Sequence, residues 1–267
     1  MSASADTAIT PGLLDAVEAL AREAGEAIMS YYRNNVAIDR KDDHSPVTDA
    51  DRDADAIIAA GLRKLTPDIP VVTEEEVAEG LAPTRVGKRF WLVDPLDGTR
   101  EFINDRDEFT VNIALIDDGA PVLGVVGVPA QGTLYAAILP HGGPGRATMC
   151  DDGGAHRPIA ARVPPAEGIA VAASRSHANK DELEAYLKDK IVTDFLAAGS
   201  SLKFCLVAEG KADLYPRLGP TMEWDTAAAH AVLAAAGGHV RTLDGKELTY
   251  GKPDFRNPHF AATGRDT

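Results

Sequence analysis

The chain has 267 residues, of which 45% are hydrophobic, and its 41 acidic and 27 basic residues give a formal net charge of −14. This composition is typical of a folded globular protein with one large or two modest domains. The negative charge repels nucleic-acid polymers and anionic membranes, which excludes them as bulk partners. A small phosphorylated substrate would also be repelled, unless bound metal or a few placed Lys and Arg residues attract it locally.

The two cysteines indicate the redox environment of the chain. Cys150 and Cys205 have no CxxC spacing, and the sequence before them shows no secretory leader, so we expect free thiols in a reducing cytoplasm. No segment approaches the roughly 20 apolar residues that a membrane span requires. We therefore expect a cytoplasmic protein without a transmembrane segment.

Helix-period spacing of apolar residues predicts a helix over residues 11–32, followed after a polar loop (39–53) by a second helix over residues 54–67. Short β-rich runs separated by Gly, Pro, Asp and Asn then predict a sheet. Its strands are expected at residues 70–73, 89–93, 109–116, 122–128 and 134–139.

In the second half of the chain, predicted strands alternate with predicted helices. Strands are expected at residues 168–173, 191–195, 212–215 and 239–243, and helices at 180–188, 201–209 and 224–236. The aperiodic segment 141–166, rich in Gly, Pro and Arg, indicates a domain boundary. We predict an α+β domain at residues 1–155 that carries most metal ligands, and an α/β domain at residues 156–267 that contributes Asp225 and substrate contacts.

An acidic motif, DPLDGT, follows the apolar strand that ends at Val93. By itself it is also compatible with an ordinary type I turn. Further carboxylates stand near other strand ends and helix starts, where enzymes built on sheets usually place their chemistry. These are Asp49, Asp51, Glu74, Glu75, Glu76 and Asp225. Taken singly, the glutamates could be a solvated loop and Asp225 a helix-dipole partner.

Together these carboxylates form a suitable Mg²⁺ site, because Mg²⁺ prefers hard oxygen ligands. No His or Cys pattern competes, which argues against zinc. Two such ions would bridge a phosphate, activate a water molecule and neutralise the leaving oxygen. The Thr99 hydroxyl could orient that water, and Gly98 allows the backbone to approach phosphate oxygens.

Three segments resemble the metal motifs of the inositol monophosphatase-like superfamily: TEEE at 73–76, WLVDPLDGTREF at 91–102 and EWDTAAAHAVLAAAGG at 223–238. Within it, the chain is most similar to the 3′(2′),5′-bisphosphate nucleotidases of the CysQ type. This similarity rests on TREFINDRDEFTVNIALID at 99–117, SRSH at 174–177 and the segment 199–228 that begins GSSLKF. Inositol phosphatases typically read DGTTNF where this chain has DGTREF, so Arg100 and Glu101 favour the nucleotidase branch.

The resemblance implies a layered αβαβα sugar-phosphatase fold, combining α+β and α/β domains, and two or three Mg²⁺ ions. The implied metal ligands are Glu74, Asp94, the carbonyl of Leu96, Asp97 and Asp225. Asp51, Glu74 and Thr99 are the implied catalytic residues. The implied substrate contacts are Lys41, Gly98, Thr99, Arg100, Ser174, Arg175, His177, Gly199, Ser201, Lys203, Arg217 and Asp225. Glu75 stays an alternative to Glu74, and no role is assigned to Met222 or Glu223.

The implied reaction removes the 3′-phosphate of adenosine 3′,5′-bisphosphate, with 3′-phosphoadenosine 5′-phosphosulfate as a further possible substrate, in sulfur metabolism. Inhibition by Li⁺ is implied as well. Inositol-1-phosphate or fructose-1,6-bisphosphate phosphatase activity is an alternative, since the fold and metal loop are shared. A non-catalytic metal- or nucleotide-binding protein is a second alternative. The sequence predicts no oligomeric state.

Overall fold

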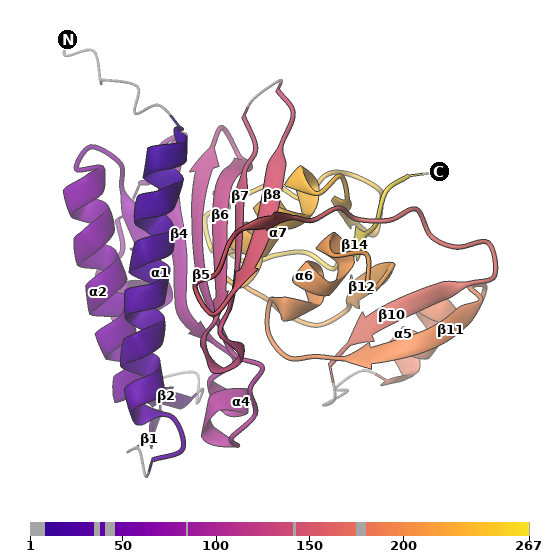
Figure 1. Cartoon of the computed structure of the whole chain (residues 1–267), viewed down its shortest axis with the longest axis horizontal. Helices are drawn as coiled ribbons and strands as arrows, with labels where there is room; N and C mark the ends of the chain where they lie inside the picture. The colour runs from indigo at the N-terminus through magenta and orange to yellow at the C-terminus, as the bar shows by residue number, and fades with distance from the viewer. Residues whose placement is uncertain are drawn as a thin grey trace.

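Two mixed β-sheets, covered and separated by helices, make up the chain (Figure 1). The computed structural model describes residues 9–34, 38–40, 46–83, 85–140, 143–174 and 180–266. In these residues the helices are α1 (Pro11–Tyr31), α2 (Asp49–Leu65), α3 (Glu74–Ala78), α4 (Thr99–Ile103), the 3₁₀ helix η1 (Pro129–Gln131), α5 (Lys180–Leu187), α6 (Leu202–Ala208) and α7 (Ala227–Ala235).

The larger sheet has seven strands in the order β3-β4-β5-β6-β7-β8-β9, in which β3 and β4 are parallel and all other neighbours antiparallel. Its strands are β3 (Val71–Thr73), β4 (Arg89–Asp97), β5 (Thr110–Asp117), β6 (Ala120–Val128), β7 (Thr133–Ile138), β8 (Arg146–Asp151) and β9 (Arg157–Pro158). A register shift interrupts the β4–β5 ladder between Asp94 and Asp97. The shift lies within the DPLDGT motif.

The smaller sheet has five strands in the order β11-β10-β12-β14-β13. Its strands are β10 (Ile169–Ala173), β11 (Val192–Ala197), β12 (Leu214–Arg217), β13 (His239–Thr242) and β14 (Phe260–Thr263). β10 is parallel to β11 and β12, whereas β14 is antiparallel to β12 and β13. A separate two-stranded ribbon pairs β1 (Ile38–Arg40) with β2 (Pro46–Thr48).

The elements stack in five layers, with α1 and α2 on the outer face of the larger sheet, α6 and α7 between the sheets, and α5 beyond the smaller sheet (Figure 1). Three apolar clusters fill the spaces between the layers. The first, around Ile28, Ile58 and Trp91, joins α1 and α2 to the larger sheet. The second lies around α6 and α7, and a small third cluster includes Val171 and Leu187 below α5. The predicted αβαβα architecture is therefore confirmed.

The second helix begins earlier than the sequence pattern predicted. Helix α2 starts at Asp49, inside the segment predicted as a loop, because Thr48 and Asp51 form a reciprocal capping box. The Asp51 carboxylate accepts hydrogen bonds from the Thr48 N–H at 2.8 Å and from its hydroxyl at 2.7 Å. The cap places Asp51 in a helix, with 2% of its surface exposed.

Other boundaries also differ from the prediction. The helix predicted from residue 224 begins at Ala227, so Asp225 lies in the turn before it. The glutamate run forms the short helix α3 instead of a loop, with the Thr73 hydroxyl accepting a hydrogen bond from the Glu76 N–H. Strands β8 and β14 and helix α4 were not predicted. The apolar runs of these elements are short and stand among glycine, proline and polar residues, so the sequence shows no clear helix or strand periodicity there.

Two further expectations concern the cysteines and the membrane. Cys150 and Cys205 are both free and buried, as expected. Across the described ranges, the structure contains no helix with the length and apolar character needed to cross a membrane. The division into domains at residues 155 and 156 stays a prediction.

Candidate active site

Three carboxylates from distant parts of the sequence meet where the two sheets face each other. Glu74 begins α3, Asp94 lies in β4, and Asp225 precedes α7. One oxygen from each lies within 4.8 Å of the others. The parallel β3–β4 pair places Glu74 and Asp94 side by side, because Thr73 is in register with Val93. The structure therefore brings together three of the five predicted ligands as one cluster.

The DPLDGT segment ends strand β4 with an irregular register and is part of this site. Asp94 is 2% exposed, and its Oδ1 accepts a hydrogen bond from the Leu96 N–H at 3.0 Å. Gly98 follows with φ 93°, a left-handed conformation that disfavours other residues. A Cβ at Gly98 would lie 2.2 Å from the Ser200 Oγ. The type I turn that the motif also allowed is not formed, because residues 94–97 belong to β4.

Asp97, the fourth predicted carboxylate, is held from the opposite side by the loop before α6. Its Oδ2 accepts the Ser201 N–H at 2.7 Å and lies 3.5 Å from the Thr110 hydroxyl. The Ser200 hydroxyl donates to the backbone carbonyl of Asp97 at 2.8 Å. Ser201 in turn hydrogen-bonds Asn112 at 2.7 Å.

This arrangement shows protein contacts for one predicted substrate residue and adds three residues that were not predicted. Ser201, predicted as a substrate contact, is buried and hydrogen-bonds neighbouring protein groups. Ser200, Thr110 and Asn112 were missed by sequence reasoning. Ser200 stands between two predicted residues in the GSSLKF motif, so that motif carried a signal for it. Thr110 and Asn112 read as ordinary strand residues, and the sequence gives no sign of their partners.

The carboxylates repel one another in a poorly hydrated space. Burial raises the pKa of Asp97 to about 6, a rise that Lys203 and the Ser201 N–H oppose and Glu74 reinforces. Burial also raises the pKa of Asp225 well above its usual range, and the charges of Asp97 and Glu74 add to that rise. A bound cation would stabilise the ionised carboxylates.

Thr99 and Asp51 form a connected pair beside the cluster. The Thr99 hydroxyl lies 3.2 Å from Asp51 Oδ1 and 3.4 Å from the carbonyl oxygen of Leu96. Since the other oxygen of Asp51 is occupied by Thr48, the carboxylate cannot rotate freely. Because Thr99 donates its hydroxyl hydrogen to Asp51, the lone pairs of the Thr99 oxygen can accept a hydrogen bond from a water molecule. The two residues are thus in hydrogen-bond contact, and their catalytic roles stay a prediction.

Two predicted cations, Lys203 and Arg217, lie close to the carboxylates. Lys203 is 3% exposed and donates from Nζ to the carbonyl oxygens of Ser200 at 2.6 Å and Ala198 at 3.3 Å. Burial lowers the pKa of Lys203 to about 8, against the opposing effect of Asp97. Lys203 therefore stabilises the loop that holds Asp97. Arg217 ends β12, donates to the carbonyl of Pro220 at 2.7 Å and affects the pKa of both Asp97 and Asp225.

The remaining predicted substrate residues are less closely grouped. Arg100 is exposed on α4, and Ser174 follows β10 with partial burial. Gly199 is packed so closely that a Cβ there would lie 2.9 Å from the Cγ of Glu101. The last three predicted contacts lie outside the described residues, namely Lys41, Arg175 and His177.

The donor set fits Mg²⁺. It offers carboxylate oxygens and the backbone carbonyl of Leu96 at the end of β4, which are hard ligands, and no thiolate or imidazole belongs to the cluster of Glu74, Asp94 and Asp225. A bound divalent cation would offset the mutual repulsion of these carboxylates. A metal ion is therefore compatible with this site, and Glu75, 8% exposed at the start of α3, stays an alternative ligand.

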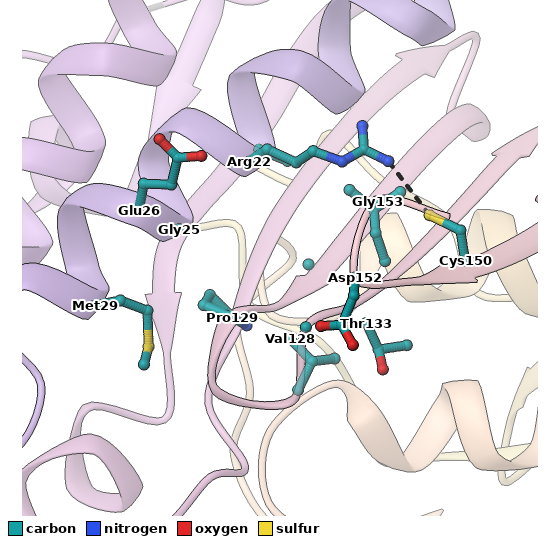
Figure 2. Close-up of a pocket in the computed structure, with 14 residues that line it drawn as sticks. Arg22, Gly25, Glu26, Met29, Val128, Pro129, Thr133, Cys150, Asp152 and Gly153 are labelled. Carbon is teal, nitrogen blue, oxygen red and sulfur yellow. Dashed lines mark hydrogen bonds between the residues drawn. The ribbon is translucent and has the colours of Figure 1, made fainter. Parts of the chain in front are cut away.

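A pocket lies elsewhere, between α1 and the β6–β7 connection (Figure 2). It measures about 230 Å³ and is lined mainly by apolar surface, including Met29 and Pro129. Arg22 donates to the Cys150 Sγ at 3.3 Å along its wall. No residue of the acidic cluster lines it, so it is a separate feature.

The fold and the acidic cluster define a class of protein. The family model for the inositol monophosphatase family matches residues 12–264, and the chain belongs to this family of metal-dependent phosphatases.

The most similar relatives refine this assignment. The chain is 50% identical over 251 residues to the 3′(2′),5′-bisphosphate nucleotidase CysQ of Escherichia coli strain K12, covering 93% of this chain and 98% of the relative. The crystal structure of CysQ from Bacteroides thetaiotaomicron matches with a TM-score of 0.78 and 37% identity, covering 97% and 99% of the two chains. An inositol monophosphatase from Zymomonas mobilis matches with a TM-score of 0.75 and 27% identity, covering 97% and 94%. The resemblance predicted from the motifs is confirmed.

Proposed function

We propose that the chain is a Mg²⁺-dependent 3′(2′),5′-bisphosphate nucleotidase. It hydrolyses the 3′-phosphate of adenosine 3′,5′-bisphosphate to give AMP, and it also accepts 3′-phosphoadenosine 5′-phosphosulfate. The observation that carries the phosphatase chemistry is the convergence of Glu74, Asp94 and Asp225 within 4.8 Å. The choice of nucleotide is supported by the CysQ relative at 50% identity.

Glu74, Asp94, the Leu96 carbonyl, Asp97 and Asp225 would hold two or three Mg²⁺ ions. When bound, the metal neutralises the phosphate and lowers the pKa of the attacking water. Thr99, oriented by Asp51, accepts a hydrogen bond from that water and aligns it. Gly98 is a further proposed backbone contact of the phosphate, on the basis of the family motif, and the Ser200 hydroxyl fills the space that a Cβ at Gly98 would take.

Positive charge for the substrate comes from few residues, because the chain as a whole is acidic. Arg217 lies close enough to the carboxylates to affect their pKa values, and it is the best-placed cation for a second phosphate. Lys203 contributes charge from a buried position. We propose Arg100, Ser174, Arg175, His177 and Lys41 as further contacts on the basis of the family motifs.

The test is phosphate release from a substrate panel with and without Mg²⁺. We expect kcat/KM on adenosine 3′,5′-bisphosphate to exceed that on inositol-1-phosphate and fructose-1,6-bisphosphate by at least about tenfold, equal to about 1.4 kcal/mol. We also expect inhibition by Li⁺. The reverse ranking would identify a sugar-phosphate phosphatase, and tight nucleotide binding without phosphate release would identify a binding protein.

A further inference from the structure

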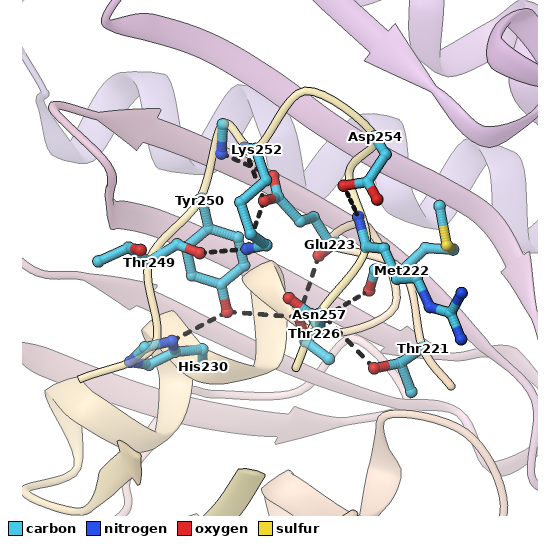
Figure 3. Close-up of polar contacts among 12 residues, drawn as sticks. Thr221, Met222, Glu223, Thr226, His230, Thr249, Tyr250, Lys252, Asp254 and Asn257 are labelled. Carbon is cyan, nitrogen blue, oxygen red and sulfur yellow. Dashed lines mark hydrogen bonds and ion pairs between the residues drawn. The ribbon is translucent and has the colours of Figure 1, made fainter. Parts of the chain in front are cut away.

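A buried hydrogen-bond network holds the segment that carries Asp225 (Figure 3). The segment, residues 221–226, connects β12 to α7, and a loop at residues 249–257 lies against it. Glu223 stands at the centre of this network and is fully buried. We call residues 221–226 and 249–257 together the clamp.

The Glu223 carboxylate is completely enclosed by donors from the loop. One oxygen accepts the Gly251 N–H at 2.7 Å, and the other accepts the Lys252 N–H at 3.0 Å. The Lys252 ammonium also pairs with that second oxygen. A buried carboxylate without such partners would be strongly unfavourable, whereas charge-assisted bonds of this kind are strong. The negative charge of Glu223 therefore fixes the position of the loop.

The loop, in turn, fixes the main chain of residues 221–223. The Glu223 N–H donates to the carbonyl of Phe255 at 2.7 Å. The Asn257 side chain donates to the carbonyl of Met222 at 2.8 Å, and its N–H donates to the carbonyl of Thr221 at 3.0 Å. Three consecutive residues of the segment are thus hydrogen-bonded to the loop.

This main chain reaches the metal site through one bond. The Met222 N–H donates to Asp225 Oδ2 at 2.9 Å, which limits the rotation of that carboxylate. The Thr226 hydroxyl donates to the carbonyl of Glu223 at 3.1 Å and lies 3.3 Å from the Tyr250 hydroxyl. Met222 and Thr226 therefore connect the turn around Asp225 to the hydrogen bonds of the clamp.

We propose that Glu223 is a positioning residue of the metal site: it fixes the clamp so that the Asp225 carboxylate faces Glu74 and Asp94. The proposal rests on the proposed function in one respect, namely that Asp225 is a metal ligand. Groups that orient metal ligands typically change metal affinity or activity by about 10- to 100-fold when they are removed. Glu223 acts at one further step, so we expect the lower end of this range.

The experiment compares Glu223→Gln with the wild type in two independent measurements. Gln keeps the size of Glu but places an NH₂ group against one of the donors, so at least one bond is lost. We expect Mn²⁺ binding, measured by electron paramagnetic resonance of the free ion, to weaken by about tenfold. In phosphate-release assays the Mg²⁺ concentration for half-maximal rate should rise by a similar factor, while kcat at saturating Mg²⁺ returns to near the wild-type value.

Asp213→Asn is the matched control. Asp213 is a buried carboxylate that also accepts a backbone N–H, from Ala170 at 2.8 Å, and pairs with Arg162 at 2.7 Å. Among the described residues, the hydrogen bonds of Asp213 go to Arg162, Ala170 and Gly264, none of which belongs to the clamp or the acidic cluster. Its variant should lower the Tm but leave the Mn²⁺ affinity within about twofold, which separates lost stability from lost positioning.

Lys252→Met is the second variant, in case Glu223→Gln does not fold. It removes the ammonium but leaves both backbone bonds to Glu223, so we expect Mn²⁺ affinity to fall about threefold. Unchanged Mn²⁺ affinity in a folded Glu223→Gln protein, or in Lys252→Met if that is the folded variant, would overturn the proposal. Equal weakening in Asp213→Asn would overturn it too. If the wild type bound no Mn²⁺, the metal site of the proposed function would fail instead.

Discussion

The two sides of the acidic cluster are built differently. On one side, Glu74 and Asp94 follow neighbouring strands of the larger sheet, and the β3–β4 register places them. On the other side, Asp225 lies in a turn held by the clamp, in which the side chains of Glu223, Asn257 and Asp225 itself bond to main-chain groups. Ladder hydrogen bonds tolerate many side chains, whereas the clamp requires particular ones. Substitutions near Asp225 should therefore affect the site more easily than substitutions near the strands.

The largest expected effect comes from a ligand on the sheet side. Asp94→Asn keeps the side-chain shape and an acceptor for the Leu96 N–H but removes the charge. We expect phosphate release to fall more than about 100-fold, because the outer partners of ligands already cost 10- to 100-fold. The Tm without metal should change little, since the ladder places this residue. Asp118→Asn, in the exposed β5–β6 turn, is the control and should keep full activity.

The next effect concerns the bond that joins the sheet side to α2. Thr99→Ala removes the hydroxyl that lies 3.2 Å from Asp51. We expect kcat to fall about 100-fold, the lower end for groups that position a proton transfer, with Mn²⁺ affinity unchanged. Thr99→Ser keeps the hydroxyl and should retain most of the activity. Equal loss in both variants would show that the methyl group, and not the hydroxyl, matters.

A stability measurement tests the contact between the sheet side and the loop before α6. Gly98→Ala adds a Cβ at φ 93°, and 2.2 Å from the Ser200 Oγ. We expect the free energy of unfolding to fall by about 2–3 kcal/mol in urea titrations. Gly119→Ala is the matched control, because its φ is 80° but its nearest contact is 3.6 Å away. It should cost only about 1 kcal/mol. Equal losses would mean that Ser200 moves aside without cost.

The smallest effect concerns Asp55, a carboxylate of helix α2. Burial raises the pKa of Asp55 to about 6, although a hydrogen bond from Thr73 opposes the rise. The charges of Glu76 and Glu79 reinforce it, and Arg63 opposes it. Because the folded pKa lies above the unfolded value of about 3.9, the folded protein loses stability as the pH rises through about 4 to 6.

Asp55→Asn removes this charge. At pH 8 we expect the variant to be more stable than the wild type by about 1–3 kcal/mol, and the difference should vanish near pH 4. The measurement is urea unfolding at several pH values. Asp68→Asn, at an exposed position, should show no such difference. If the wild type gained stability relative to Asp55→Asn as the pH rose from 4 to 6, the sign of this prediction would be wrong.

Sequence reasoning found the elements that have a clear period. The apolar spacing of α1 and the β-rich runs of the larger sheet predicted both within a few residues. It missed the start of α2, which depends on the cap between Thr48 and Asp51, and it missed β8, whose apolar run stands in a segment rich in glycine and proline. The spacing of apolar residues reveals an element only where that element has a continuous apolar face. The start of α2 and the segment around β8 lack such a face.

The candidate site could be predicted where its residues stand in compact motifs. Glu74, Asp94 and Asp225 were expected together because each lies in a motif of the family, and the structure places them together. The clamp could not be predicted, since Glu223 and Gly251 are 28 residues apart and join only through the tertiary fold. Buried polar groups choose partners by position in space, which the order of residues does not reveal.

The position of β14 has a consequence for how the protein is made. This strand, Phe260–Thr263, is the last along the sequence, yet it lies inside the smaller sheet, between β12 and β13. During synthesis β14 leaves the ribosome after the other four strands of this sheet, so the sheet lacks an inner member until residues 260–263 have emerged. The loop of the clamp emerges only shortly before β14. The turn that carries Asp225 should therefore become ordered only after β14 has emerged, and ribosome-bound chains truncated before Phe260 should be more sensitive to proteases in this half.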